Sequence, residues 1–230
     1  LCQENIDEKA VFITGNTVVD ACFRHLEIAN KAGIQEESLA NLDIENMDNI
    51  LTLTMHRAEN VDDKERLINI ISALKELKDM NIIFPIHPRT KKTLENFNLF
   101  DELNELDNVH IIKPLGYLDF LILTSHSTLI LTDSGGLQEE AITLDVPVLT
   151  LRYNTERPET VSAGGNILVG ANKNNILENA KKILNDEEFA NKMKNAKNPY
   201  GKGDAAIKTI DAIEEAYNNG LLDIKAPENI

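Results

Sequence analysis

Short apolar runs rich in β-branched residues alternate along the chain with longer stretches in which apolar residues recur three and four positions apart. The short runs are typical of buried strands and the longer stretches of amphipathic helices, so their alternation predicts βαβ units and a mostly parallel sheet. The predicted strands are Ala10–Thr14, Asn49–Met55, Asn81–Ile86, Val109–Ile112, Thr128–Thr132, Val146–Leu151 and Ile167–Val169.

The segment Asp63–Lys78 is predicted to be a helix that covers this sheet. Asn60 and Asp63 resemble a start signal of the capping-box type, and one helix face carries Leu67, Ile70, Ile71, Leu74 and Leu77. Parallel sheets need cover on both faces and right-handed crossovers. We therefore expect a doubly wound, Rossmann-like α/β domain and not a (β/α) barrel, which needs eight strands.

One strong Gly/Pro-rich break, Asn198–Gly203, divides the chain. It predicts an α/β domain over residues 1–198, a terminal helix over 199–220 and a tail over 221–230. The terminal helix carries an apolar face made of Ala206, Ile210, Ile213 and Tyr217. The chain begins with Leu, and its first six residues are typical of the end of a helix, so we expect that residues precede position 1.

The charge balance narrows the range of partners. Among 230 residues, 23 Lys and Arg face 38 Asp and Glu, which gives a formal net charge of −15. This excess disfavours nucleic acid and anionic membranes as partners. No run approaches the ~18 apolar residues that span a bilayer, and no signal-peptide pattern is present, so we expect a cytoplasmic protein. Cys2 and Cys22 lack the spacing of a metal site and are interpreted as inert thiols.

The segment Thr128–Glu140 is a candidate ligand site, because an apolar strand there leads into Ser134, Gly135 and Gly136 and then into a helix. Paired glycines allow close approach of an anion, and a helix N-terminus favours phosphate. Glu140, one turn further on, is placed to accept the hydroxyls of a ribose. The alternative is a tight turn capped by Ser134 with solvated glutamates. The pattern is neither G-x-G-x-x-G nor a Walker loop, so dinucleotide and ATP cofactors are not indicated.

Two histidines and one arginine-containing loop also lie at strand ends. His56 directly follows the strand Asn49–Met55, and His87 comes two residues after Pro85. An imidazole there would donate to a phosphate or exchange a proton; the alternative is a structural histidine. After the strand Val146–Leu151, a loop holds Arg152 and Arg157, whose guanidinium groups suit a diphosphate or sugar hydroxyls. Surface ion pairs are the alternative for this loop. No cluster has the spacing of a zinc site.

Together these motifs resemble the non-hydrolysing UDP-N-acetylglucosamine 2-epimerases, which have a two-domain, glycosyltransferase-B-like fold. Six segments follow the family's order over nearly the whole chain: Thr14–Ala21, His56–Asn60, Pro85–Pro88, Thr132–Glu140, Thr155–Glu159 and Asn198–Gly201. The chain resembles the C-terminal, UDP-binding half of that fold. The family's N-terminal domain, with its Gly-x-Arg-Pro turn and proton-moving acids, has no counterpart in these residues, and the terminal helix would cross back to it.

The resemblance implies elimination of UDP from UDP-GlcNAc and its re-addition to give UDP-ManNAc, without a redox cofactor or metal, by a full-length homodimer. By resemblance His56 is the catalytic residue, and Ser134, Gly135 and Gly136 bind the diphosphate. Phe120 matches the position beside the uracil, Glu140 the ribose contact, and Arg157 the contact to sugar and diphosphate. Arg57 and His87 match the activator site, which binds a second UDP-GlcNAc in bacterial members.

Two other functions stay open at the level of sequence. A glycosyltransferase of the same architecture would bind a UDP-sugar here and transfer the sugar to an acceptor. A catalytically silent nucleotide-binding module is the alternative that is not an enzyme.

Overall fold

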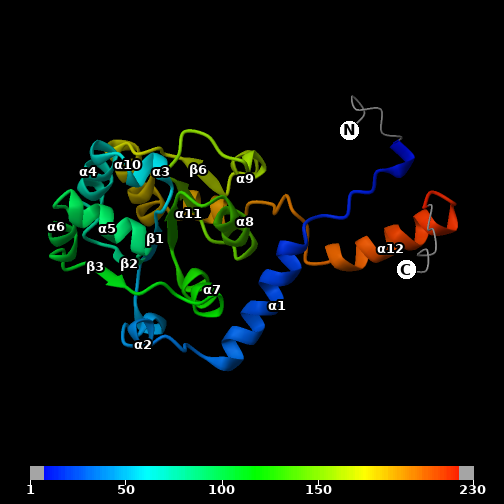
Figure 1. The fold of residues 1–230 in the computed structure, drawn as a ribbon, viewed down its shortest axis with the longest axis horizontal. Coiled ribbons are helices and arrows are strands. Elements are labelled where there is room, and N and C mark those ends of the chain that lie inside the picture. The colour runs from blue at the N-terminus through cyan, green and yellow to red at the C-terminus, as the bar shows by residue number, and fades with distance from the viewer. Residues whose placement is uncertain (1–7, 223–230) are drawn as a thin grey trace, which may run out of the picture. The chain divides into compact units, whose positions relative to one another are not determined.

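The computed structural model describes residues 8–222, which form two compact units (Figure 1). One unit comprises residues 22–199, and the other comprises the described residues up to 21 and from 200 onward. The expectations for Cys2, for the first six residues and for most of the tail fall outside the described residues. The crossing of a terminal helix to a further domain stays a prediction.

The larger unit is built on a six-stranded parallel sheet with the strand order β3-β2-β1-β4-β5-β6. Its strands are β1 (Ile50–Thr54), β2 (Asn81–Pro85), β3 (Val109–Ile112), β4 (Leu129–Thr132), β5 (Val148–Thr150) and β6 (Asn166–Leu168). The chain moves outward from β1 to β3 and then returns to place β4 beside β1, so the winding reverses between β1 and β4. The predicted doubly wound α/β fold is confirmed.

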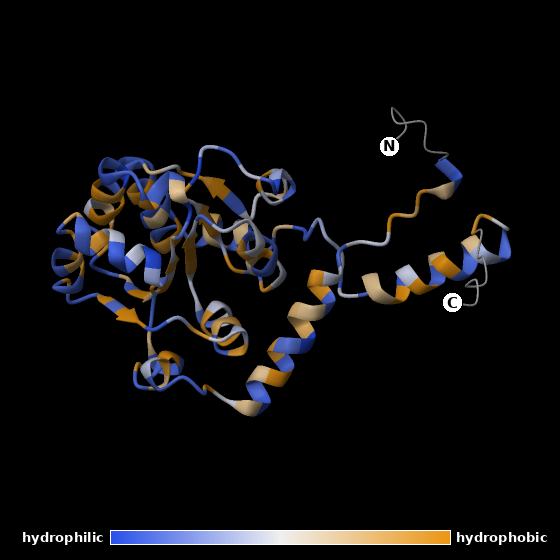
Figure 2. Cartoon of the chain, viewed as in Figure 1, coloured by the Kyte–Doolittle hydropathy of each residue, from blue (hydrophilic) through white to orange (hydrophobic). Residues whose placement is uncertain are grey.

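Successive residues of the central strands face opposite layers of helices, because strand side chains alternate. Leu51 and Leu53 pack in one layer, while Ile50 packs in the other. The first layer holds α4 (Lys64–Leu74), α5 (Pro88–Asn96), α6 (Phe100–Asn104), α10 (Lys173–Asn185) and α11 (Glu187–Lys194). The second holds α7 (Tyr117–His126), α8 (Gly135–Thr143), α2 (Glu37–Ala40) and the later part of α1 (Thr17–Ala32). Apolar strands between these layers are visible in Figure 2.

The predicted helix at Asp63 is present as α4, which begins at Lys64. The Asp63 carboxylate accepts the backbone N–H groups of Glu65 and Arg66 at 2.9 and 3.1 Å, as an N-cap residue does. The helix ends at Leu74, earlier than predicted. Asn60, the other half of the expected start signal, lies in the short helix α3 (Ala58–Val61), where it is buried.

The strand predicted at Ala10–Thr14 is wrong. A single 3₁₀ turn, η2 (Glu8–Ala10), is followed by an unpaired connection to α1. Phe12 and Thr14 are half-buried along a cavity of about 350 Å³ beside α12 (Ala205–Asn218), whereas Ile13 is 95% exposed. The alternation that predicted a strand thus reflects packing against a helix, and none of the described strands pairs with this segment.

The terminal helix α12 exposes most of the apolar face predicted for it. Ile210, Ile213 and Tyr217 are 57%, 51% and 61% exposed, and apolar positions recur along the helix in Figure 2. The first backbone N–H groups, those of Ala205 and Ala206, donate to Asp20 at 3.2 and 3.1 Å. Its start is therefore fixed, while little apolar burial stabilises the remainder.

We expect α12 to open far more readily than the central sheet in the 230-residue chain. The amides of Ile210 and Ile213 should exchange at least ~100-fold faster than those of Leu129–Leu131, corresponding to an opening free energy ~2.7 kcal/mol smaller. Hydrogen exchange followed by NMR measures both sets together. Equal protection would mean that α12 is stabilised by contacts other than those described.

Candidate functional site

The candidate site lies where β1 and β4 end side by side, the point at which the winding of the sheet reverses. Open α/β sheets bind ligands beyond the carboxyl ends of their strands at such a point. A cavity of about 390 Å³ opens there, which is within the size range of small-molecule sites. Its wall includes six of the residues singled out in the sequence: His56, His87, Phe120, Ser134, Gly136 and Glu140.

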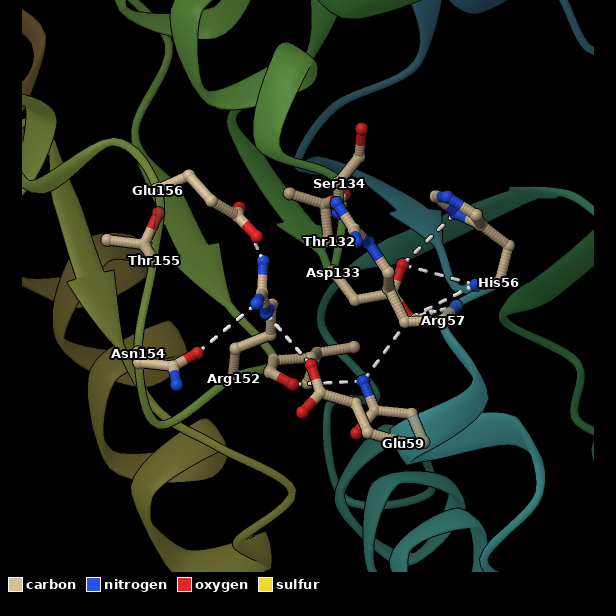
Figure 3. Close-up of polar contacts among 12 residues, drawn as sticks. His56, Arg57, Glu59, Thr132, Asp133, Ser134, Arg152, Asn154, Thr155 and Glu156 are labelled. Atoms are coloured by element: carbon tan, nitrogen blue, oxygen red, sulfur yellow. Dashed lines mark hydrogen bonds and ion pairs between the residues drawn. The ribbon is translucent and has the colours of Figure 1, made fainter.

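A buried carboxylate, that of Asp133, holds His56 in place (Figure 3). Asp133 follows β4, its side chain is 0% exposed, and it lies 3.1 Å from His56 Nδ1. It also accepts the backbone N–H groups of His56 at 3.1 Å and of Arg57 at 2.9 Å, and the Asn60 amide at 3.2 Å. Because the carboxylate accepts from Nδ1–H, it leaves Nε2 of His56 for a ligand.

These hydrogen bonds keep Asp133 ionised. Burial by itself raises the pKa of Asp133, but the hydrogen bond from the His56 side chain and those from the backbone of Arg57 and His56 outweigh it. The net pKa of Asp133 lies below its ordinary value, because each of these donors favours the charged carboxylate.

The N-terminus of α8 is open to the cavity. Ser134 is the N-cap residue, but its side chain caps no backbone N–H group. Gly135 and Gly136, which begin the helix, do not have positive φ. A Cβ atom added at Gly136 would meet no atom within 4 Å, and one at Gly135 would lie 3.2 Å from Glu156 Oε2. The described fold therefore does not require glycine at position 136.

Phe120 of α7 and Glu140 of α8 line the cavity away from this helix start. Glu140 is half-buried. Burial raises the pKa of Glu140, the Tyr117 hydrogen bond lowers it, and the neighbouring Glu139 raises it, so that the net shift is upward. The cavity thus has donors at one end and an acceptor at the other.

The arginines predicted from the sequence lie beside the cavity and do not belong to its lining. Arg157 Nε lies 2.7 Å from Glu139 Oε1, and its Nη1 donates to the Glu156 carbonyl at 3.0 Å. The Arg57 side chain extends toward Ser134 in Figure 3. His87 lies in the cavity wall, with its ring centroid 6.3 Å from that of His56.

Sequence reasoning assigned no role to Asp133, and it grouped Arg152 with Arg157 in a loop whose guanidinium groups suit a diphosphate. Arg152 is only 9% exposed and joins two motifs, with Nε 2.8 Å from Glu59 and Nη1 2.7 Å from Glu156 (Figure 3). Its hydrogen bond lowers the pKa of Glu156 to about 2. The loop thus contains the ion pair that the sequence left open as an alternative, but the arginine is buried. The sequence feature that pointed to Arg152 was its position directly after a buried strand.

The described residues contain no group of three or more His, Cys, Asp or Glu side chains arranged to hold a metal ion. Nor does any helix described between residues 8 and 222 have the length and apolar character needed to cross a membrane.

Comparison with known proteins identifies relatives of this chain. The family model described as UDP-N-acetylglucosamine 2-epimerase matches residues 1–214. The UDP-N-acetylglucosamine 2-epimerase of Methanocaldococcus jannaschii is 48% identical over 213 residues, which cover 91% of this chain and 56% of the relative. That of Campylobacter jejuni is 38% identical, covering 95% and 58% of the two chains. The chain therefore spans a little over half the length of these relatives.

Solved structures agree with the fold. The Methanocaldococcus jannaschii UDP-GlcNAc 2-epimerase in complex with UDP-GlcNAc and UDP superimposes with a TM-score of 0.76 at 46% identity, over 93% of this chain and 57% of that one. A sucrose-phosphate synthase of Thermosynechococcus elongatus, at 14% identity and a TM-score of 0.59, shares the fold alone. The Rossmann-like half of a glycosyltransferase-B-like architecture, as expected from the sequence, is confirmed.

Replacing Asp133 by Asn should destabilise the chain by about 1–3 kcal/mol at pH 7, because the new amide leaves buried donors without an acceptor. The folded pKa of Asp133 is depressed, so its stabilisation is complete above the ordinary pKa of ~3.9 and is lost as the pH falls through the folded value. Urea unfolding measures the free energy of unfolding of the wild type and of Asp133→Asn from pH 7 to pH 3. The two free energies should converge below pH ~4. The exposed Asp107→Asn is the matched control, and a pH-independent gap between wild type and Asp133→Asn would contradict this account.

Proposed function

Since this chain belongs to the UDP-N-acetylglucosamine 2-epimerase family, we propose that it forms the C-terminal, UDP-binding half of such an enzyme. The observation that carries the proposal is the cavity in which His56, held by Asp133, faces the open N-terminus of α8. This arrangement offers an anion several N–H donors, and it places them where a doubly wound sheet binds nucleotides.

The diphosphate binds at the start of α8 in this proposal. The backbone N–H groups of Gly135 and Gly136 belong to the first turn, where a helix has no acceptors of its own. The Ser134 hydroxyl and His56 Nε2 add side-chain donors. The bare surface at Gly136 lets the phosphates approach the backbone, which a side chain would obstruct.

The nucleoside extends from there toward α7. Glu140 accepts the ribose hydroxyls, and Phe120 lies beside the uracil. Arg157 would contact the sugar and the diphosphate only by turning from Glu139. Arg57 and His87 are proposed to belong to an activator site for a second UDP-GlcNAc.

The reaction proposed for the full-length protein eliminates UDP across carbons 1 and 2 of UDP-GlcNAc and adds it back with the opposite configuration at carbon 2. Breaking the anomeric C–O bond places negative charge on the β-phosphate. Donors fixed in advance stabilise this charge best when water is excluded. His56 therefore acts on the leaving group, while the family's N-terminal domain supplies the acids that move the proton at carbon 2. We propose a cytoplasmic homodimer as the full-length form.

The 230-residue chain should bind UDP weakly and show no epimerase activity. Half of a cleft desolvates one side of its ligand, so water still screens the electrostatic contacts. Calorimetry tests binding, and a coupled assay tests conversion of UDP-GlcNAc to UDP-ManNAc. Turnover by this chain, or no UDP binding, would contradict the proposal. Conversion without an acceptor by the full-length protein would separate an epimerase from a glycosyltransferase.

Two substitutions test whether the start of α8 binds phosphate or is only a turn between a strand and a helix. Gly136→Ala should leave stability unchanged or raise it by up to ~1 kcal/mol, since alanine favours helices. The same change should weaken UDP binding at least ~10-fold, because the added methyl group occupies the approach to the backbone. Glu140→Gln should weaken UDP binding by ~1–3 kcal/mol through the loss of a charge-assisted hydrogen bond.

Melting temperature and UDP affinity are measured on both variants. The exposed Glu178→Gln on α10 serves as the control for the change in charge. Unchanged affinity in both site variants would remove this loop from the binding site and with it the main support for a UDP-sugar enzyme.

A further inference from the structure

We propose that Asn60 is a positioning residue of the candidate site. By holding one oxygen of the Asp133 carboxylate, it turns the other oxygen toward His56 and so fixes the tautomer that this imidazole presents to the cavity. Asn60 belongs to the segment His56–Asn60 and has no role in the proposed function. The inference concerns the free site, so it does not depend on which ligand the cavity binds.

The amide of Asn60 joins the ends of three strands. Asn60 follows β1, is 0% exposed, and uses both N–H bonds of its Nδ2. One reaches Asp133 Oδ2, after β4, at 3.2 Å, and the other reaches the carbonyl oxygen of Leu151, after β5, at 2.9 Å. A carbonyl oxygen only accepts, so the contact with Leu151 fixes which way the amide faces.

The two oxygens of Asp133 have different partners. Oδ2 accepts the backbone N–H of Arg57 at 2.9 Å and the Asn60 amide at 3.2 Å, while Oδ1 lies 3.1 Å from His56 Nδ1. The backbone N–H of His56 lies 3.1 Å from both oxygens and favours neither. The terminal torsion of an aspartate is broad by itself. Asn60 therefore narrows it by holding the oxygen that faces away from the imidazole.

This orientation selects one of the two neutral forms of the His56 ring. An ionised carboxylate accepts and does not donate, so Nδ1 carries the proton where it faces Oδ1, and Nε2 is left bare. The other tautomer would set the Nδ1 lone pair against a buried charge. A bare Nε2 accepts a hydrogen bond, or it takes up a proton and then donates to an anion. The donor role proposed for Nε2 thus requires that His56 first binds a proton.

Glu59 offers a matched control, because it makes a second link between the same two segments. Its Oε1 lies 2.8 Å from Nε of Arg152, which follows Leu151 in the chain, and none of its described contacts is to Asp133. Loss of either side chain loosens α3 from the end of β5, but only the loss of Asn60 removes a donor from Asp133. A purely structural effect would appear in both variants, and a positioning effect in one.

Nitrogen-15 NMR of the imidazole rings tests the inference in the 230-residue chain at pH ~9, where histidine side chains are ordinarily neutral. The signals of His56 are those absent from His56→Gln. The wild type should favour the Nδ1–H form at least ~10-fold, as expected for a hydrogen bond to a charged group. Asn60→Leu should lower this preference at least ~3-fold through the loss of one hydrogen bond, and Glu59→Gln should keep it within ~2-fold. Asn60→Ala removes the donor without adding bulk and is measured alongside, with melting temperatures for all variants.

Three outcomes would overturn the role of Asn60. These are an Nε2–H ring in the wild type, an unchanged preference in the Asn60 variants, and equal losses in the Asn60 and Glu59 variants, since the last would show that anchoring of α3 suffices. The measurement uses no ligand, so its outcome is separate from that of UDP binding, on which the proposed function depends.

Discussion

The buried carboxylate of Asp133 joins the ends of the two central strands, and the geometry of the candidate site depends on it. Asp133 follows β4, yet its hydrogen bonds go to the backbone and side chains that follow β1. The hydroxyls of Thr54 and Thr132, 2.6 Å apart, make a second link between the same strands. A buried charge is stable only when donors surround it. The loop after β1 therefore has to keep one conformation, and that conformation presents His56 to the cavity.

The start of α8 shows a different case, in which the fold does not account for the glycine and the proposed ligand would. Gly136 lies in a helix without positive φ and with open space at its missing Cβ. Glycine lowers helix stability relative to alanine, so the fold gains nothing from it at this position. At Gly15, by contrast, φ is +94° and an added Cβ would lie 2.8 Å from the Tyr200 carbonyl oxygen. Glycine thus has a structural reason at position 15, whereas at position 136 the proposed approach of a phosphate to the backbone would explain it.

The sequence predicted most of the sheet because buried parallel strands are short apolar runs, which local patterns detect. It predicted a false strand at Ala10–Thr14 because alternation alone does not distinguish pairing with a strand from packing on a helix. The cavity residues were found through motifs at strand ends. Asp133 was not assigned because its role follows from the adjacency of β1 and β4, which are 75 residues apart from Thr54 to Leu129 in the chain. Arg152 likewise contacts Glu59 at 2.8 Å, and this pairing of two distant motifs is not encoded in local spacing.

Two adjacent glutamates on α8 have different partners, and this difference gives the candidate site a direction. Glu139 is paired with the guanidinium of Arg157, whereas none of the ion pairs among the described residues includes Glu140. In its ionised form the Glu140 carboxylate would repel a phosphate while accepting hydrogen bonds from hydroxyl groups. Four residues of helix, or ~6 Å, separate it from the N–H groups at Gly136 that attract phosphate. A ligand with an anionic end and a hydroxyl-bearing neutral end can satisfy both only in one direction, with its phosphates at the helix start. In a chain of net charge −15, this local gradient and not the overall field would orient a nucleotide in the proposed site.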